Sequence, residues 1–177
     1  MTLDFNHNFY ELFGLAPRFD LDLAELDRSY REIQVQIHPD KYAQAGDADR
    51  RASMQWTTRV NEAYQTLKEP MRRAAYLLAL HGVDPEFETN TAMSPEFLTR
   101  QMEWREAVEE ASNAADACEL VRLSARLRKD LDQLYGEMTR ELRAQASYPA
   151  AAQTLRKLKF LEKVNEEIGD AHERLEA

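Results

Sequence analysis

The chain contains little of what metal sites, disulfide bonds and nucleotide-binding loops are made from. Among its 177 residues it has one cysteine, Cys118, and four histidines. One cysteine excludes a disulfide within the chain, and no Cys-x-x-Cys pair or His/Cys cluster supplies ligands at the spacing of a structural zinc site. Its five glycines form no glycine-rich phosphate loop. We therefore expect no metal and no other cofactor.

Long apolar runs and an excess of positive charge are missing as well. No stretch approaches the ~20 consecutive apolar residues of a membrane-spanning helix, and the first residues lack the basic start of a signal peptide. The 23 basic and 32 acidic side chains give a net charge of −9, which is unsuited to neutralising the phosphates of a nucleic acid. We expect a soluble cytoplasmic protein that binds neither membranes nor nucleic acids.

The apolar residues recur at helical spacing in two separate halves of the sequence. No alternation of apolar and polar residues is long enough to indicate a β-strand. Residues 1–82 carry a net charge of −2 and residues 83–177 one of −7, and a Gly-Val-Asp-Pro sequence followed by a polar run separates them. The sequence predicts an all-α protein with domains at 8–82 and 94–177, joined by a linker at 83–93.

A proline ends the first long helix of the N-terminal domain. A short helix is predicted at 8–15, with Gly14 to Pro17 as the segment that ends it. A longer amphipathic helix begins after Asp22. The longer helix must end at Pro39, because proline cannot continue a helix. His38 and Asp40 therefore stand together on an exposed corner. This arrangement suits docking better than catalysis.

Two further helices follow this corner. An amphipathic stripe predicts the third helix at 47–68, while Pro70 in a first turn and Gly82 at a C-terminal end delimit the fourth. The second and third helices are joined by a short connection, so we expect them to form an antiparallel hairpin. We expect Tyr76, Leu77 and Leu80 of the fourth helix to pack on that hairpin.

Three long helices are predicted in the C-terminal domain. The first begins with Ser94 as its cap and Pro95 in its first turn. The second and third each carry an apolar stripe at helical spacing, and Pro149 interrupts the pattern between them. Three amphipathic helices joined by short connections are typical of an antiparallel bundle.

The sequence around the corner resembles the J-domain of the co-chaperones that stimulate seventy-kilodalton heat-shock chaperones. The matching segments are residues 9–15 (FYELFGL), 33–41 (IQVQIHPDK) and 60–67 (VNEAYQTL). A lone His-Pro-Asp tripeptide is common by chance, but its place between two matching helices makes this resemblance specific. The resemblance implies the J-domain fold, an antiparallel helical hairpin with short helices beside it.

The rest of the chain is similar to the HscB family, the J-proteins of bacterial iron–sulfur cluster assembly. The similar segments are residues 73–82 (RAAYLLALHG), the acidic helix from Phe97, and residues 154–161 (TLRKLKFL). The resemblance implies that the J-domain binds the specialised chaperone HscA and that the bundle holds the cluster scaffold IscU. The cysteine-rich zinc element of some eukaryotic relatives is missing, which indicates a bacterial, metal-free form.

The resemblance also implies which residues bind the chaperone. In J-proteins the tripeptide at 38–40 promotes ATP hydrolysis on the chaperone, although its spacing alone fits an ordinary capped turn equally well. Arg28 and Arg31 lie three residues apart on one solvent face of the second helix, and Lys41 follows the corner. These cations suit an acidic chaperone surface. A solvated helix face is the alternative explanation of the arginine pair.

The first helix of the bundle carries a candidate binding face. On a helical wheel, Leu98 and Met102 lie outside the sector that faces the bundle, beside a row of acidic side chains. Apolar residues next to carboxylates are typical of a patch for a basic partner, but single exposed apolar residues are also common. The resemblance assigns the IscU-binding face to Leu98, Thr99, Met102, Glu103, Glu106, Glu110 and Phe160. Thr99 departs from the apolar residue expected there, and periodicity alone places Phe160 partly buried at the edge of the core.

Other functions fit parts of the sequence. A general J-protein that delivers unfolded clients to a DnaK-type chaperone would carry a Gly/Phe-rich stretch and β-domains, and neither is present. A structural adaptor with a degenerate J-like module is disfavoured by the intact tripeptide. An enzyme that used His38 as a base lacks an accompanying nucleophile and oxyanion donors. We therefore interpret the chain as a non-enzymatic co-chaperone that activates HscA and delivers IscU to it.

Overall fold

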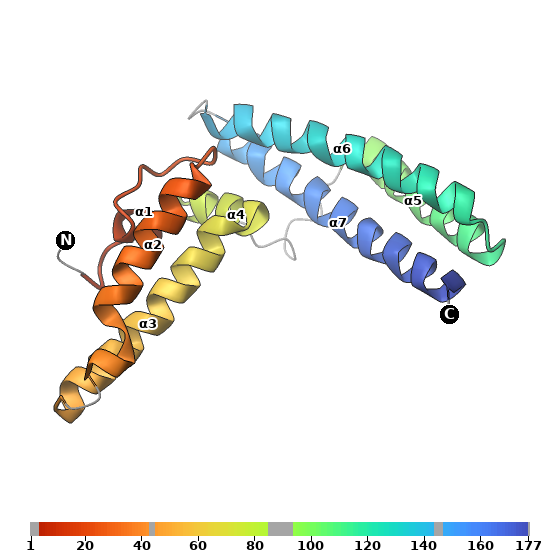
Figure 1. The fold of residues 1–177 in the computed structure, drawn as a ribbon. Coiled ribbons are helices and arrows are strands. Elements are labelled where there is room, and N and C mark those ends of the chain that lie inside the picture. The colour runs from red at the N-terminus through yellow and green to blue at the C-terminus, as the bar shows by residue number, and fades with distance from the viewer. Residues whose placement is uncertain (1–3, 43–44, 85–93, 144–146, 177) are drawn as a thin grey trace. The chain divides into compact units, whose positions relative to one another are not determined.

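The computed structural model describes residues 4–42, 45–84, 94–143 and 147–176. Every regular element in these ranges is a helix, which confirms the predicted all-α class. The elements, shown in Figure 1, are α1 (Phe9–Leu12), α2 (Leu23–Ile37), the 3₁₀ helix η1 (Pro39–Tyr42), α3 (Asp47–Lys68), α4 (Pro70–Leu80), α5 (Pro95–Asn113), α6 (Ala117–Arg143) and α7 (Tyr148–Glu176). None of the helices in the described ranges is long and apolar enough to cross a membrane.

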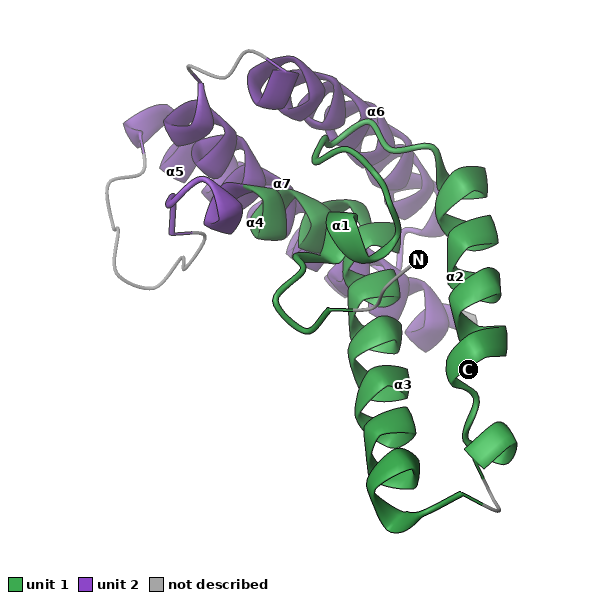
Figure 2. Cartoon of the chain, turned by 90° about the vertical axis from the view of Figure 1, so that its left-hand side faces the viewer, with its two compact units in different colours: residues 1–77 green, residues 78–177 purple. Residues whose placement is uncertain are grey.

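The chain divides into two compact units, residues 1–77 and 78–177, which Figure 2 colours separately. The division falls inside α4. The domain limits inferred from the sequence, 8–82 and 94–177, stay predictions. Most of the predicted linker, 83–93, lies outside the described residues.

The N-terminal unit is built around a hairpin in which α2 and α3 lie side by side (Figure 1). The Asp22 carboxylate accepts hydrogen bonds from the amides of Ala24 and Glu25 and so begins α2. The helix ends at Ile37, before the proline, as predicted. The buried stripes of the two helices contain Leu26, Ile33, Ile37, Val60, Ala63 and Leu67.

One edge of the hairpin is closed by polar and aromatic side chains. The rings of Tyr30 and Tyr64 stack with their centroids 4.0 Å apart. The Tyr64 hydroxyl donates to the Asp27 carboxylate over 2.7 Å. The Asn61 side-chain oxygen accepts from the Tyr30 hydroxyl at 2.9 Å and from the Gln34 amide at 2.6 Å. These bonds tie the α2 surface to α3 outside the apolar core.

The first helix is shorter than predicted, spanning Phe9–Leu12 rather than 8–15. Asn8 and Glu11 form a reciprocal capping box at its start. Gly14 has a φ of 67°, a left-handed conformation that ends a helix. Gly14 is the first residue of the segment predicted to end this helix, and its left-handed conformation ends the helix before Leu15.

The fourth helix ends as predicted, because Gly82 follows it with a left-handed φ of 72°. Leu77 is buried, but Leu80 is 40% exposed, so the expected packing of Leu80 is wrong. Leu78 is fully buried instead. At about 100° per residue, Leu80 lies about 200° from Leu78, and one helix cannot bury both on the same side.

The C-terminal unit is the predicted three-helix bundle. The long helices α6 and α7 pair along their length, and α5 packs on both (Figure 1). The Ser94 hydroxyl accepts a hydrogen bond from the Phe97 amide and caps α5. The buried core is formed by Trp104, Val108, Ala111, Leu120, Leu123, Leu127, Leu161, Val164, Ile168 and Ala171. The Arg126 guanidinium covers the Trp104 ring at 4.6 Å.

Candidate functional site

The His-Pro-Asp corner lies where α2 passes into η1. The His38 side chain is 53% exposed and that of Asp40 is 89% exposed. The Asp40 backbone N–H donates to His38 Nδ1 over 3.2 Å. A nitrogen that accepts this proton carries none itself, so the neutral ring holds its proton on Nε2. The Asp40 carboxylate lies 3.5 Å from the same Nδ1 and forms an ion pair with the ring only when the ring is protonated.

Two side chains hold the residues that lead into the corner. The Ser53 hydroxyl of α3 donates to the carbonyl of Ile37, the last residue of α2, over 2.6 Å. The Tyr42 hydroxyl of η1 donates to the Gln36 carbonyl over 3.3 Å. The last carbonyls of a helix have no partner within it, so these bonds supply one. The sequence interpretation missed both residues, although a polar Ser53 seven residues before the buried Val60 was a usable signal.

The predicted cations are exposed on α2 and directly after the corner. Arg28 and Arg31 are exposed, as is Lys41 beyond the corner. Val35 is 65% exposed and follows Arg31 by four residues, so it shares the face of the two arginines. The sequence interpretation did not select Val35, because an isolated valine carries no motif. Its helical spacing from the arginines would have identified it.

The predicted outward face of α5 is exposed. Leu98 is 47% and Met102 62% exposed, whereas Phe97 and Trp104 are buried. The polar members of the face are also exposed, namely Thr99, Glu103, Glu106 and Glu110. The orientation of α5 inferred from its wheel is therefore confirmed. The Thr99 hydroxyl donates to the Pro95 carbonyl over 3.1 Å, so that hydrogen is used within the helix.

Phe160 links α7 to the same turn of α5. It is half-buried, as periodicity predicts, and its ring meets the Phe97 ring edge to face, with centroids 5.7 Å apart and planes at 83°. Leu98 is the next residue after Phe97. The structure thus brings Phe160 beside the turn that carries Leu98, although the two residues lie far apart in the sequence.

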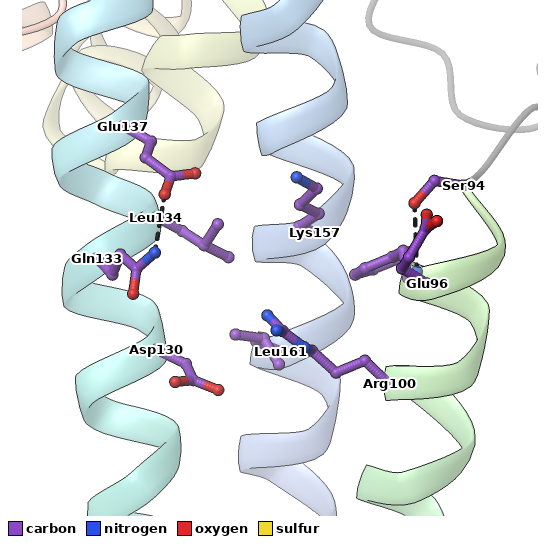
Figure 3. A pocket seen from close by; sticks show the side chains of 10 residues that line it. Ser94, Glu96, Arg100, Asp130, Gln133, Leu134, Glu137, Lys157 and Leu161 are labelled. Carbon is purple, nitrogen blue, oxygen red and sulfur yellow. Dashed lines mark hydrogen bonds between the residues drawn. The ribbon is translucent and has the colours of Figure 1, made fainter.

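A separate hollow of about 300 Å³ opens between the three helices of the bundle. Figure 3 shows Arg100 of α5 and Lys157 of α7 on one side of it, and Asp130 and Glu137 of α6 on the other. Phe97, Leu134 and Leu161 also line it. Arg100 lies about 200° from Leu98 around α5, so this hollow opens on a different side of the helix from the Leu98 face.

In the described parts of the chain, no group of three or more histidine, cysteine, aspartate or glutamate side chains is placed so that it could hold a metal ion. One carboxylate beside the hollow has a shifted pKa. A backbone amide and then the Ser94 hydroxyl hydrogen-bond Glu96 and lower its pKa. This interaction belongs to the cap of α5 and not to a reactive centre.

Two family models match most of the chain. The DnaJ domain model matches residues 8–76, and the model described as the HSCB C-terminal oligomerisation domain matches residues 93–169. The first contains the His-Pro-Asp corner and the cations of α2. The second contains the exposed face of α5 and Phe160.

Individual relatives are similar over nearly their whole length. The chain is 47% identical to the Co-chaperone protein HscB homolog of Azoarcus sp. (strain BH72), over 99% of each chain. It is 49% identical to the homolog of Burkholderia multivorans, over 94% of this chain and 95% of that one.

Solved structures show the same fold. The chaperone HscB from Vibrio cholerae matches with a TM-score of 0.83 and 38% identity, over 96% of this chain and 99% of that one. Human co-chaperone protein HscB matches with a TM-score of 0.87 and 25% identity, over 96% and 84%. The chain therefore belongs to the HscB family of J-domain co-chaperones.

Proposed function

We propose that this chain stimulates ATP hydrolysis by the chaperone HscA and delivers the scaffold IscU to it during iron–sulfur cluster assembly in the bacterial cytoplasm. The observation that carries the proposal is the exposed His-Pro-Asp corner of a J-domain, joined in one chain to a bundle matched by the HSCB C-terminal model. The chain performs no covalent chemistry in this scheme. It acts by binding two proteins.

The corner and the outer face of α2 form the chaperone contact in this proposal. His38, Pro39 and Asp40 supply the trigger at the exposed corner. Arg28, Arg31 and Lys41 attract an acidic surface, which speeds encounter more than it strengthens the final complex. The exposed Val35 adds apolar area on the same face as the arginines.

The exposed face of α5 forms the scaffold contact. Leu98 and Met102 supply apolar area that the partner removes from water, and Phe160 extends this area onto α7. Glu103, Glu106 and Glu110 border the apolar residues and select a basic partner surface. Thr99 contributes least, because its hydroxyl hydrogen is already bonded within α5.

Because the chaperone contact and the scaffold contact are in one chain, each can be weak and the chain still brings the scaffold to the chaperone. A scaffold held on the bundle reaches the chaperone at a high effective concentration, since the J-domain is bound nearby. If the scaffold and the J-domain both prefer the ADP-bound state of the chaperone, each one shifts the chaperone toward that state. ATP hydrolysis then becomes coupled to capture of one particular client.

The test replaces the histidine of the corner. His38→Gln should lower stimulation of the HscA ATPase at least tenfold and leave IscU affinity unchanged, because the two sites lie in different units. His172→Gln, in α7, is the matched control and should retain full stimulation. Full stimulation by His38→Gln would refute the proposed trigger. Stimulation of a DnaK-type chaperone but not of HscA would favour the general J-protein.

A further inference from the structure

The last backbone carbonyls of α2 lie immediately before the His-Pro-Asp corner. The carbonyls of the last turn have no intrahelical partner, and Pro39 carries no N–H that could continue the helix. The Ile37 carbonyl is also buried where Ser53 contacts it. A buried carbonyl without a partner is strongly unfavourable, so this group needs a donor from elsewhere in the fold.

Ser53 of α3 supplies that donor from the core side. Ser53 is only 4% exposed, although serine residues in proteins are mostly exposed. Its hydroxyl reaches the Ile37 carbonyl over 2.6 Å. Its own backbone carbonyl accepts from the Thr57 hydroxyl over 2.9 Å. Ser53 therefore links α3 directly to the residue that precedes His38.

Tyr42 of η1 supplies a second donor from the solvent side. Its hydroxyl donates to the Gln36 carbonyl over 3.3 Å, so η1 is tied back to the last turn of α2. The tripeptide lies between Ile37, which Ser53 contacts, and Tyr42. The Lys41 amide also donates to the His38 carbonyl over 3.0 Å. The corner is thus held at both of its ends.

We propose that Ser53 and Tyr42 are positioning residues that hold His38 and Asp40 in their docking geometry, an inference that rests on the proposed chaperone contact. Without the Ser53 hydroxyl, the Ile37 carbonyl must move toward water to find a partner. His38 is bonded to Ile37 and moves with it. The hydrogen bond from the Asp40 amide to His38 Nδ1 then changes as well.

The two residues differ in how strongly they act. The bond of Ser53 is buried, whereas that of Tyr42 is exposed and longer. Water replaces the exposed Tyr42 hydroxyl more readily than the buried Ser53 hydroxyl. We therefore expect Ser53→Ala to disturb the corner more than Tyr42→Phe, although each variant loses one hydroxyl.

The structure offers a conservative rescue and a matched control. Ser53 lines a hollow of about 300 Å³ together with Ala52 and Trp56, so the extra methyl group of Ser53→Thr has room and the hydroxyl is kept. Thr58 is exposed on the same helix, and its hydroxyl bonds only the Met54 carbonyl one turn earlier. Thr58→Ala therefore removes a hydroxyl from α3 without touching the corner.

The experiment measures HscA ATPase stimulation by the full chain, at a temperature where circular dichroism shows every variant folded. Ser53→Ala should raise the concentration needed for half-maximal stimulation about tenfold. Tyr42→Phe should raise it about twofold to threefold. Ser53→Thr should return it to within about twofold of the unsubstituted chain, and Thr58→Ala should leave it unchanged.

Amide NMR provides a readout independent of the chaperone. The Asp40 amide resonance should shift in Ser53→Ala and return in Ser53→Thr. A Ser53→Ala chain that is less stable but keeps the original Asp40 resonance and half-maximal concentration would overturn the inference. If the unsubstituted chain fails to stimulate HscA, the proposed function fails, and an unmoved Asp40 resonance then refutes the positioning role separately.

Discussion

The sharpest prediction concerns the two exposed apolar residues of α5. Replacing both Leu98 and Met102 by alanine should weaken IscU binding at least tenfold without destabilising the free chain. Both residues are exposed, at 47% and 62%, so their truncation leaves no cavity in the core. Phe160 is left intact, because it packs on Phe97 and its loss would mix stability with binding.

The magnitude follows from the exposed fractions. Complete burial of a leucine or methionine side chain is worth about 1.5–3 kcal/mol. The exposed part of Leu98 therefore has about 0.7–1.4 kcal/mol to gain from a partner, and that of Met102 about 0.9–1.9 kcal/mol. Their sum, about 1.6–3.3 kcal/mol, corresponds to a roughly 10- to 200-fold change in Kd. Alanine keeps the Cβ atom, so we expect the lower half of this range.

Val121 provides the matched control, because it is an apolar side chain with 59% exposure on a different helix, α6. Isothermal titration calorimetry with purified IscU should show the loss of affinity for Leu98→Ala/Met102→Ala and full affinity for Val121→Ala. Thermal unfolding midpoints of both variants should stay within about 2 °C of the unsubstituted chain.

Two results would contradict this reasoning. An unchanged Kd in the double variant would show that the scaffold binds elsewhere. An equal loss in Val121→Ala would show that any exposed apolar residue of the bundle has the same effect, and the α5 face would then have no special role.

The remaining predictions concern pH and salt. Burial is the main cause that raises the pKa of Tyr10 well above its usual 10.0. The contribution of Tyr10 to the free energy of unfolding is therefore fully present below pH 10. It falls as the pH rises above 10, because the tyrosine of the unfolded chain ionises first. Chemical denaturation between pH 9 and 11 should show this fall, and Tyr10→Phe should reduce its slope; equal slopes would refute the assignment. Replacing Arg28 and Arg31 by glutamate should slow association with HscA about fivefold or more in stopped-flow measurements at low salt, and the difference should shrink as added salt screens the charges. A salt-independent difference would argue against steering.

Helix positions were predictable because their signals are local. The proline after α2, the cap residues and the apolar spacing each act within a few residues, and the observed bounds of α2 and α3 agree with them. The two exceptions differ in cause. The end of α1 is set locally by the left-handed Gly14, whereas the exposure of Leu80 depends on which side of α4 the tertiary packing buries.

The two candidate sites differed in how much the sequence could reveal. The corner is contiguous, so its tripeptide and the cations of α2 were visible as a motif with a defined spacing. The outward orientation of Leu98 and Met102 was also predictable, because a helical wheel needs only one helix. Periodicity also predicted the partial burial of Phe160, but its contact with Phe97 was not predictable, since it depends on how α7 packs on α5.

The sequence by itself determined the all-α class, the corner and the outward face of α5, because each follows from backbone chemistry and periodicity along one segment. Tertiary structure decided which separate segments meet. It joined Ser53 of α3 to the Ile37 carbonyl of α2 and set the Phe160 ring against Phe97. A hydrogen bond or ring contact between helices depends on their packing in three dimensions, which no single segment encodes.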